Sequence, residues 1–149
     1  MMEAFWSLAG MASAAFIAAT LLPAQSEAVF VGLLAAKSVD PLALFLTASL
    51  ANTAGSLLNW WLGRLIAQRG VEALPVRLRP DPARLAKAQG WFGRFGWPSL
   101  LFAWLPVVGD PLTFVAGTLN FPLGRFILLV LIGKAARYAA LWAGWTSLA

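Results

Sequence analysis

The sequence predicts an all-α membrane protein with two inverted repeats, each a re-entrant helical hairpin followed by a transmembrane helix. Of the 149 residues, 60% are hydrophobic and 11% are charged, whereas roughly one quarter are charged in soluble domains. Residues 42–62 form an uncharged run, and a helix of that length is roughly 30 Å long, the thickness of a bilayer core. Shorter apolar runs with central breaks predict the hairpins.

The composition also limits the chemistry. Cysteine and histidine are both absent, so disulfides, thiol nucleophiles, imidazole bases and most zinc, haem or copper sites are not expected. We therefore predict no cofactor and no metal. The net charge of +5 comes from cations clustered between apolar segments, which favours membrane orientation over nucleic-acid binding. No cation precedes the first apolar run, so we interpret it as mature protein and not as a signal peptide.

Two segments have the length of a full span. Residues 42–62 end with Trp60 and Trp61, and Arg64 follows shortly after them. This aromatic belt and cation are typical of a membrane interface. Residues 126–145 form the second span and carry Lys134 and Arg137 near its middle, where each charge is costly.

The other apolar segments predict hairpins. Residues 97–108 and 111–121 would each form roughly 16–18 Å of helix, half of a bilayer core, on either side of Gly109-Asp110-Pro111. Residues 5–22 are just long enough to span, but a short run at 28–36 follows them, which predicts a hairpin with a longer first arm. The predicted breaks are Pro23, Pro106, Gly109 and Pro111.

The two halves share a pattern. Proline precedes a carboxylate by four residues at Pro23 and Glu27 and again at Pro106 and Asp110. We predict one membrane domain over residues 1–149, with repeat one at about 5–64, a connector at about 65–94 and repeat two at about 95–147. Each unit crosses the membrane once, so the second copy must be inverted relative to the first.

The connector sets the orientation. It carries seven cations against two acids from position 64 to position 94, while Lys37 stands alone on the opposite face, so we predict that it is cytoplasmic. Asp81 and Pro82 are typical of a helix start, and residues 83–92 predict an amphipathic surface helix. This helix anchors the protein at the interface or, alternatively, serves regulation or partner binding.

Several stretches together resemble a known family. They are LPAQSE at 22–27, NTAG at 52–55, NWWLG at 59–63, WLPVVGDPLTFVAGTLN at 104–120, GK at 133–134 and RY at 137–138. These resemble the DedA (VTT-domain) membrane proteins, especially their YqaA-like branch. The resemblance implies inverted re-entrant hairpins and translocation or scrambling of anionic lipids such as undecaprenyl phosphate, with dependence on the proton-motive force. The hairpin arginines of better-studied relatives do not carry over, because Ala103 or Trp104 and Gly109 stand at those positions.

Four charged residues form the candidate site. Lys134 and Arg137 are three residues apart, so they share one helix face. We expect both to face Glu27 and Asp110, which we expect to be more buried than the connector acids Glu72 and Asp81. In one interpretation the cations bind a lipid phosphate and the acids relay protons or compete as internal anions; in the other, the four charges merely neutralise each other.

Two asparagines add to the site. Asn52 falls opposite Lys134 in the repeat and is a candidate substrate-binding residue, whereas Asn59 is better explained by hydrogen bonding between helices. The predicted function is translocation or scrambling of an anionic lipid phosphate, with membrane lipids and protons as partners and a homodimer left open. A non-transporting organiser of membrane complexes is the alternative, and an enzyme is disfavoured because no histidine, cysteine or carboxylate cluster is present.

Overall fold

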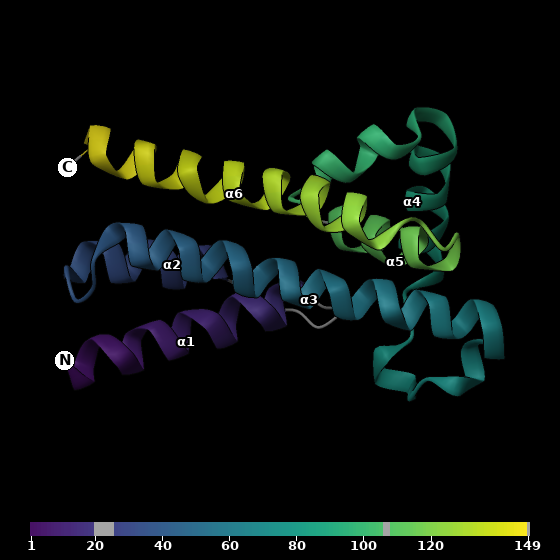
Figure 1. The fold of residues 1–149 in the computed structure, drawn as a ribbon, viewed down its shortest axis with the longest axis horizontal. Helices are drawn as coiled ribbons and strands as arrows, with labels where there is room; N and C mark the ends of the chain where they lie inside the picture. Colours follow the sequence, from purple (N-terminus) through teal and green to yellow (C-terminus); the bar gives the residue numbers. More distant parts are fainter. Residues whose placement is uncertain (20–25, 106–107, 149) are drawn as a thin grey trace.

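The structure is a computed structural model that describes residues 1–19, 26–105 and 108–148. Within these residues all regular elements are helical (Figure 1). The α-helices are α1 (Met2–Ala19), α2 (Ser26–Ala36), α3 (Pro41–Arg69), α4 (Pro82–Phe95), α5 (Gly109–Thr118) and α6 (Leu123–Leu148). Three short 3₁₀ helices complete the described elements: η1 (Val71–Ala73), η2 (Val76–Leu78) and η3 (Trp97–Phe102).

Helices α1, α3 and α6 are long and apolar enough to cross a membrane. Helices α3 and α6 confirm the two predicted full-length spans and extend beyond them, to 29 and 26 residues. Helix α1 has 18 residues, roughly 27 Å, and corresponds to the predicted longer first arm. Helix α2, with 11 residues, is too short to span.

The surface of α3 reverses the pattern of a soluble protein. Leu42, Leu46 and Leu50 form a stripe at every fourth position that is about half exposed, at 53%, 48% and 58%. The same helix buries polar side chains, among them Ser49, Asn52, Thr53, Ser56 and Asn59. Apolar residues outside and polar residues inside are stable where the surroundings are hydrocarbon.

Local sequence signals fix the ends of α3 and α4. The Asp40 carboxylate accepts a hydrogen bond of 2.9 Å from the Ala43 amide, and Pro41 occupies the first helical turn. Asp81 caps α4 in the same way, at 3.2 Å from the Ala83 amide, which confirms the predicted helix start. Each helix ends at a glycine with positive φ, Gly70 at 85° and Gly96 at 69°, a conformation that glycine adopts without strain.

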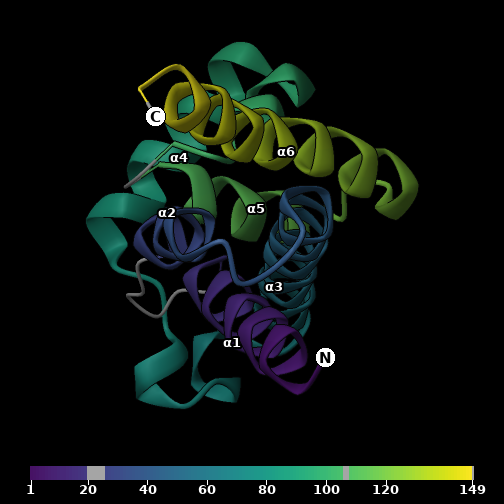
Figure 2. The same cartoon turned by 90° about the vertical axis from the view of Figure 1, so that its left-hand side faces the viewer.

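Helix α3 is the centre of the fold, because α1, α5 and α6 all pack against it, whereas α4 and η3 pack on α5 and α6 (Figures 1 and 2). Helix α1 contacts the first half, where Gly55 lies against the carbonyl of Phe16. Helix α5 contacts the second half through a reciprocal pair: Gly63 lies against the Phe114 carbonyl, and Gly117 lies against the Trp60 carbonyl. Such close backbone approach is typical of membrane helices with small residues at their interface.

The second predicted hairpin differs in its details. Of the three breaks predicted there, Gly109 and Pro111 lie in the first turn of α5, and Pro106 lies outside the described residues. The described residues between η3 and α5, at 103–105 and 108, belong to no helix. A proline is tolerated in a first turn because its missing N–H would have no intrahelical partner there, and Asp110 is favoured beside the positive helix end. The first arm is also a 3₁₀ helix of six residues rather than an α-helix over residues 97–108.

Candidate functional site

Lys134 forms an ion pair with Asp110. Its ammonium Nζ donates to Asp110 Oδ1 at 3.0 Å, which joins the middle of α6 to the first turn of α5. The lysine side chain is almost fully buried, at 2% exposure, while that of Asp110 is 31% exposed. A buried cation without a partner would be strongly destabilising, so Asp110 compensates the charge of Lys134.

Arg137 lies one turn further along α6 and pairs with the other predicted acid. Its Nη1 lies 2.8 Å from Glu27 Oε1, in the first turn of α2. The same nitrogen donates to the carbonyl of Trp104 at 3.2 Å. Arg137 Nε is buried and has no acceptor among the described residues.

A buried hydroxyl network adjoins this arginine. Tyr138 Oη lies 2.8 Å from Ser26 Oγ and accepts a hydrogen bond of 3.1 Å from Asn52 Nδ2. Arg137 Nη2 reaches Ser26 Oγ at 3.4 Å and Tyr138 Oη at 3.5 Å. All three partners of the network, Ser26, Asn52 and Tyr138, are at most 1% exposed. The network links α2, α3 and α6 around the guanidinium.

Asn59 has a different role from Asn52. Its Nδ2 donates to the carbonyl of Ala19 at 2.7 Å and to Thr113 Oγ1 at 3.2 Å. It therefore ties the last residue of α1 to α5 across α3, as the sequence predicted for a bond between helices.

Glu27 and Asp110 are more buried than the connector acids, as expected. Glu27 and Asp110 are both half-buried, whereas Glu72 and Asp81 are exposed. The structure therefore groups Lys134, Arg137, Glu27, Asp110 and Asn52 around one face of α6. Asn52 reaches this group through Tyr138 and not by direct contact with Lys134. Gly109 lies against the Ala103 carbonyl, where an added Cβ would collide, and Pro23 and Pro106 lie outside the described residues.

Sequence reasoning missed two members of the cluster. Tyr138 and Ser26 were not predicted as site residues, although each stands next to one that was. Tyr138 is the only tyrosine in the chain and lies in an apolar span, where a buried phenol needs a hydrogen-bond partner. That signal would have indicated Tyr138, whereas nothing in the sequence pairs it with Ser26.

The chemistry available is anion binding and proton exchange. Two cations face two carboxylates, and hydroxyl and amide groups surround them. In residues 1–19, 26–105 and 108–148, no three histidine, cysteine or carboxylate side chains gather as a metal site would require. The arrangement lets an anion with several acceptor oxygens replace a carboxylate at either cation.

Several known proteins are similar in sequence to this chain over most of its length. Inner membrane protein YqaA of Escherichia coli K12 is 39% identical over 134 residues, which is 90% of this chain and 87% of the relative. An uncharacterized protein of Haemophilus influenzae is 37% identical over 92% of this chain and 88% of its own. Undecaprenyl phosphate transporter A of Staphylococcus aureus is 27% identical over 76% of this chain and 59% of its own. No solved structure shows significant similarity.

The location follows from these findings. A relative of nearly equal length is named an inner membrane protein, and three helices of the chain are long and apolar enough to span a bilayer. The protein is therefore located in the inner membrane, as the sequence predicted. Residues 22–144 match the VTT domain, a stretch that includes Glu27, Asp110, Lys134 and Arg137, and the chain thus belongs to the VTT-domain (DedA) family of membrane proteins.

Proposed function

We propose that this protein moves an anionic lipid phosphate, of the undecaprenyl phosphate or phospholipid class, between the leaflets of the inner membrane. The observation that carries the proposal is the pair of cations on one face of a spanning helix, each held by an acid from a different short helix. Two charges at that depth are costly. A mobile anion that exchanges with the acids would account for both.

We further propose that the fold consists of inverted re-entrant hairpins with a cytoplasmic connector. Two features support it. Glu27 and Asp110 occupy equivalent places, each in the first turn of a short helix and each paired with α6. Helix α1 supports it too, because Ala19 contacts Gly55 close to the middle of α3, where inverted repeats are expected to meet.

In the proposed mechanism the lipid phosphate replaces a carboxylate on Arg137. The guanidinium offers planar, paired donors that suit two phosphate oxygens, and its Nε, which has no acceptor among the described residues, adds a donor for that exchange. When Glu27 takes up a proton, it releases Nη1 to the phosphate; when the phosphate leaves, the carboxylate loses its proton and restores the ion pair. Lys134 stabilises the same anion as a point charge.

Unequal exposure within the ion pairs supports proton coupling. The Glu27 and Asp110 side chains are 42% and 31% exposed, whereas those of Arg137 and Lys134 are 18% and 2% exposed. The acids can therefore exchange protons with the surroundings while the cations stay inside the protein. We propose transport without chemical conversion of the lipid, so the protein is not an enzyme.

The relatives support a lipid phosphate as the substrate. One of them is named an undecaprenyl phosphate transporter, and its similarity covers three quarters of this chain. The rival function, a passive organiser of other membrane complexes, would need the four charges only as ties between helices. The side-chain geometry of arginine separates these two functions. An ion pair that joins two helices needs only a positive charge, whereas phosphate recognition also needs the planar guanidinium with its paired donors.

The test is lipid transport by purified protein in liposomes. A fluorescent phospholipid or undecaprenyl phosphate is placed in both leaflets, and its accessibility to an external quencher is followed with and without a pH gradient. We expect the wild type to bring the inner pool of lipid within reach of the quencher. Arg137→Lys should do so at least tenfold more slowly while remaining folded. Glu27→Gln, which imitates the protonated acid, should bind the lipid but lose the response to the gradient.

Lys87→Gln is the matched control, since Lys87 is an exposed cation of α4 and far from the site in sequence. It should transport as the wild type does. Normal transport by a folded Arg137→Lys variant would contradict phosphate recognition at Arg137 and favour the organiser.

A further inference from the structure

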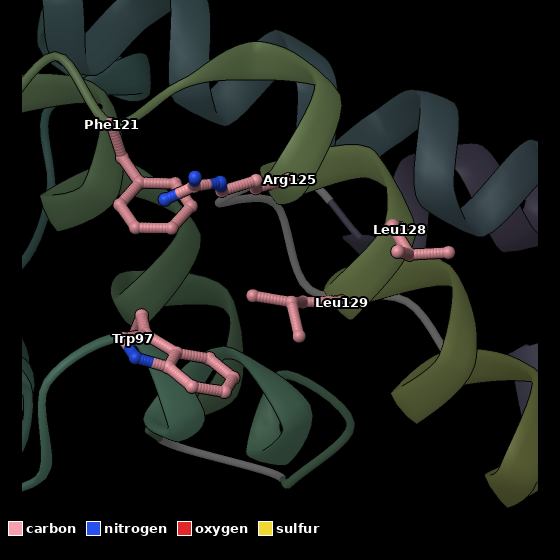
Figure 3. A pocket seen from close by; sticks show the side chains of 5 residues that line it. All are labelled: Trp97, Phe121, Arg125, Leu128 and Leu129. Atoms are coloured by element: carbon pink, nitrogen blue, oxygen red, sulfur yellow. The ribbon is translucent and has the colours of Figure 1, made fainter.

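A pocket lies between η3 and the start of α6 (Figure 3). Its volume is about 320 Å³, at the lower end of the roughly 300–1,000 Å³ of small-molecule sites. Four apolar side chains and one cation line it: Trp97, Phe121, Leu128, Leu129 and Arg125. The pocket can therefore hold a segment of an apolar chain next to a positive charge.

The lining residues are ordered by depth along α6. Arg125 belongs to the first turn of the helix, and Leu128 and Leu129 follow three and four residues later, roughly 5–6 Å further along its axis. Trp97 and Leu129 face each other across the pocket (Figure 3). A ligand that fits this order has an anionic head at Arg125 and an apolar tail that runs toward the bilayer interior.

Charge complementarity identifies the head. Arg125 is exposed, and none of the ion pairs among residues 1–19, 26–105 and 108–148 involves it. It also stands at the end of α6 where the helix dipole is positive, which disfavours a cation and favours an anion. An anion bound beside Arg125 would be stabilised by both charges, and the apolar pocket next to it requires that this anion carry a tail.

We propose that this pocket binds an anionic phospholipid of the cytoplasmic leaflet, with its phosphate on Arg125 and one acyl chain along Leu128 and Leu129. The leaflet rests on the proposed cytoplasmic position of the cation-rich connector, which leads directly into η3 and so lies at this end of the molecule. Trp97 is placed as interfacial tryptophans are, with an apolar ring and a polar N–H at the headgroup level.

This site is separate from the cluster at Lys134. The two cations are nine residues apart on α6, roughly 14 Å along its axis. The proposal does not rest on transport, and binding can be measured whether or not the protein moves lipids.

The test uses the full-length protein in detergent micelles and phosphatidylglycerol with brominated acyl chains, which quench nearby tryptophans. The chain has eight tryptophans, so the signal of Trp97 is the difference between the wild type and Trp97→Phe. We expect phosphatidylglycerol to quench Trp97 at a lower mole fraction than brominated phosphatidylcholine. Arg125→Gln should raise that mole fraction about fivefold, and Arg125→Lys should restore most of the preference.

Arg94→Gln is the matched control, because Arg94 is an exposed cation on the same side that does not line the pocket; it should leave quenching of Trp97 unchanged. An equal loss in both variants would show general charge attraction and overturn the site, as would equal quenching by the two lipids. A different result would assign the pocket to a second copy of the chain instead. In that case the lipids would not quench Trp97, and light scattering would show that Arg125→Gln converts a dimer into a monomer.

Discussion

The phenolic oxygen of Tyr138 lies 2.8 Å from the hydroxyl of Ser26, and this contact joins the middle of α6 to the first residue of α2. The same phenol accepts a hydrogen bond from Asn52 of α3. One hydroxyl thus holds three helices beside Arg137. Its ring contributes separately, since Phe30 packs against it at 5.1 Å between ring centroids.

Tyr138→Phe removes the hydroxyl and keeps the ring. We expect it to lower the free energy of unfolding in detergent by about 1–2 kcal/mol, because two interhelix hydrogen bonds disappear and Ser26 and Asn52 lose a partner inside the protein. Thr146→Ala is the control, since it removes an exposed hydroxyl of the same helix that donates to the Ala143 carbonyl within that helix. Equal stability of the two variants would contradict the structural role of the phenol.

Asp110→Asn leaves the buried Lys134 without a counter-charge. We expect a loss of roughly 3–5 kcal/mol in unfolding free energy, the usual effect of breaking one partner of a buried pair. The double variant Asp110→Asn with Lys134→Met should recover most of that loss, because no isolated charge remains. A double-mutant cycle measured by chemical unfolding checks this, and additive effects of the two changes would mean that the pair is not coupled.

Gly117→Ala places a methyl group against the Trp60 carbonyl of α3. Backbone cannot yield as a side chain does, so we expect a loss of at least about 3 kcal/mol or failure to fold. Gly144→Ala is the matched control in α6, where an added Cβ meets nothing within 4 Å. That variant should be neutral or more stable by up to about 1 kcal/mol, because alanine favours helix. Thermal unfolding of both variants gives the comparison.

The orientation is tested by labelling single cysteines in this naturally cysteine-free chain. We expect a membrane-impermeant thiol reagent to modify intact cells at Asp40→Cys and Leu148→Cys but not at Pro80→Cys. The connector cations are the reason, since they favour the cytoplasmic side. Permeabilised cells provide the control, in which position 80 must react. Labelling of position 80 in intact cells would reverse the orientation.

Local signals in the sequence predicted some parts of this fold well. The spans at α3 and α6 follow from run length, and the start of α4 follows from Asp81 and Pro82. Gly109 and Pro111, two of the three breaks predicted in the second hairpin, lie in the first turn of α5, because Pro111 fits either a turn or the first turn of a helix, and only packing decides between them. The pairs Lys134 with Asp110 and Arg137 with Glu27 depend on how α6 is rotated against α2 and α5, which residue spacing does not specify.

The glycine contacts on α3 divide the molecule into a stiff part and a part free to shift. Gly63 and Gly117 each fit against a carbonyl of the opposite helix. Helices α3 and α5 are therefore packed backbone to backbone and cannot slide past each other without a steric clash. Helix α6 contacts α2 and α5 through the long side chains of its two ion pairs, while Gly133 fits it against the Leu101 carbonyl of η3. Relative movement of helices during transport is therefore expected between α6 and the α3–α5 pair, and it requires the two ion pairs to open.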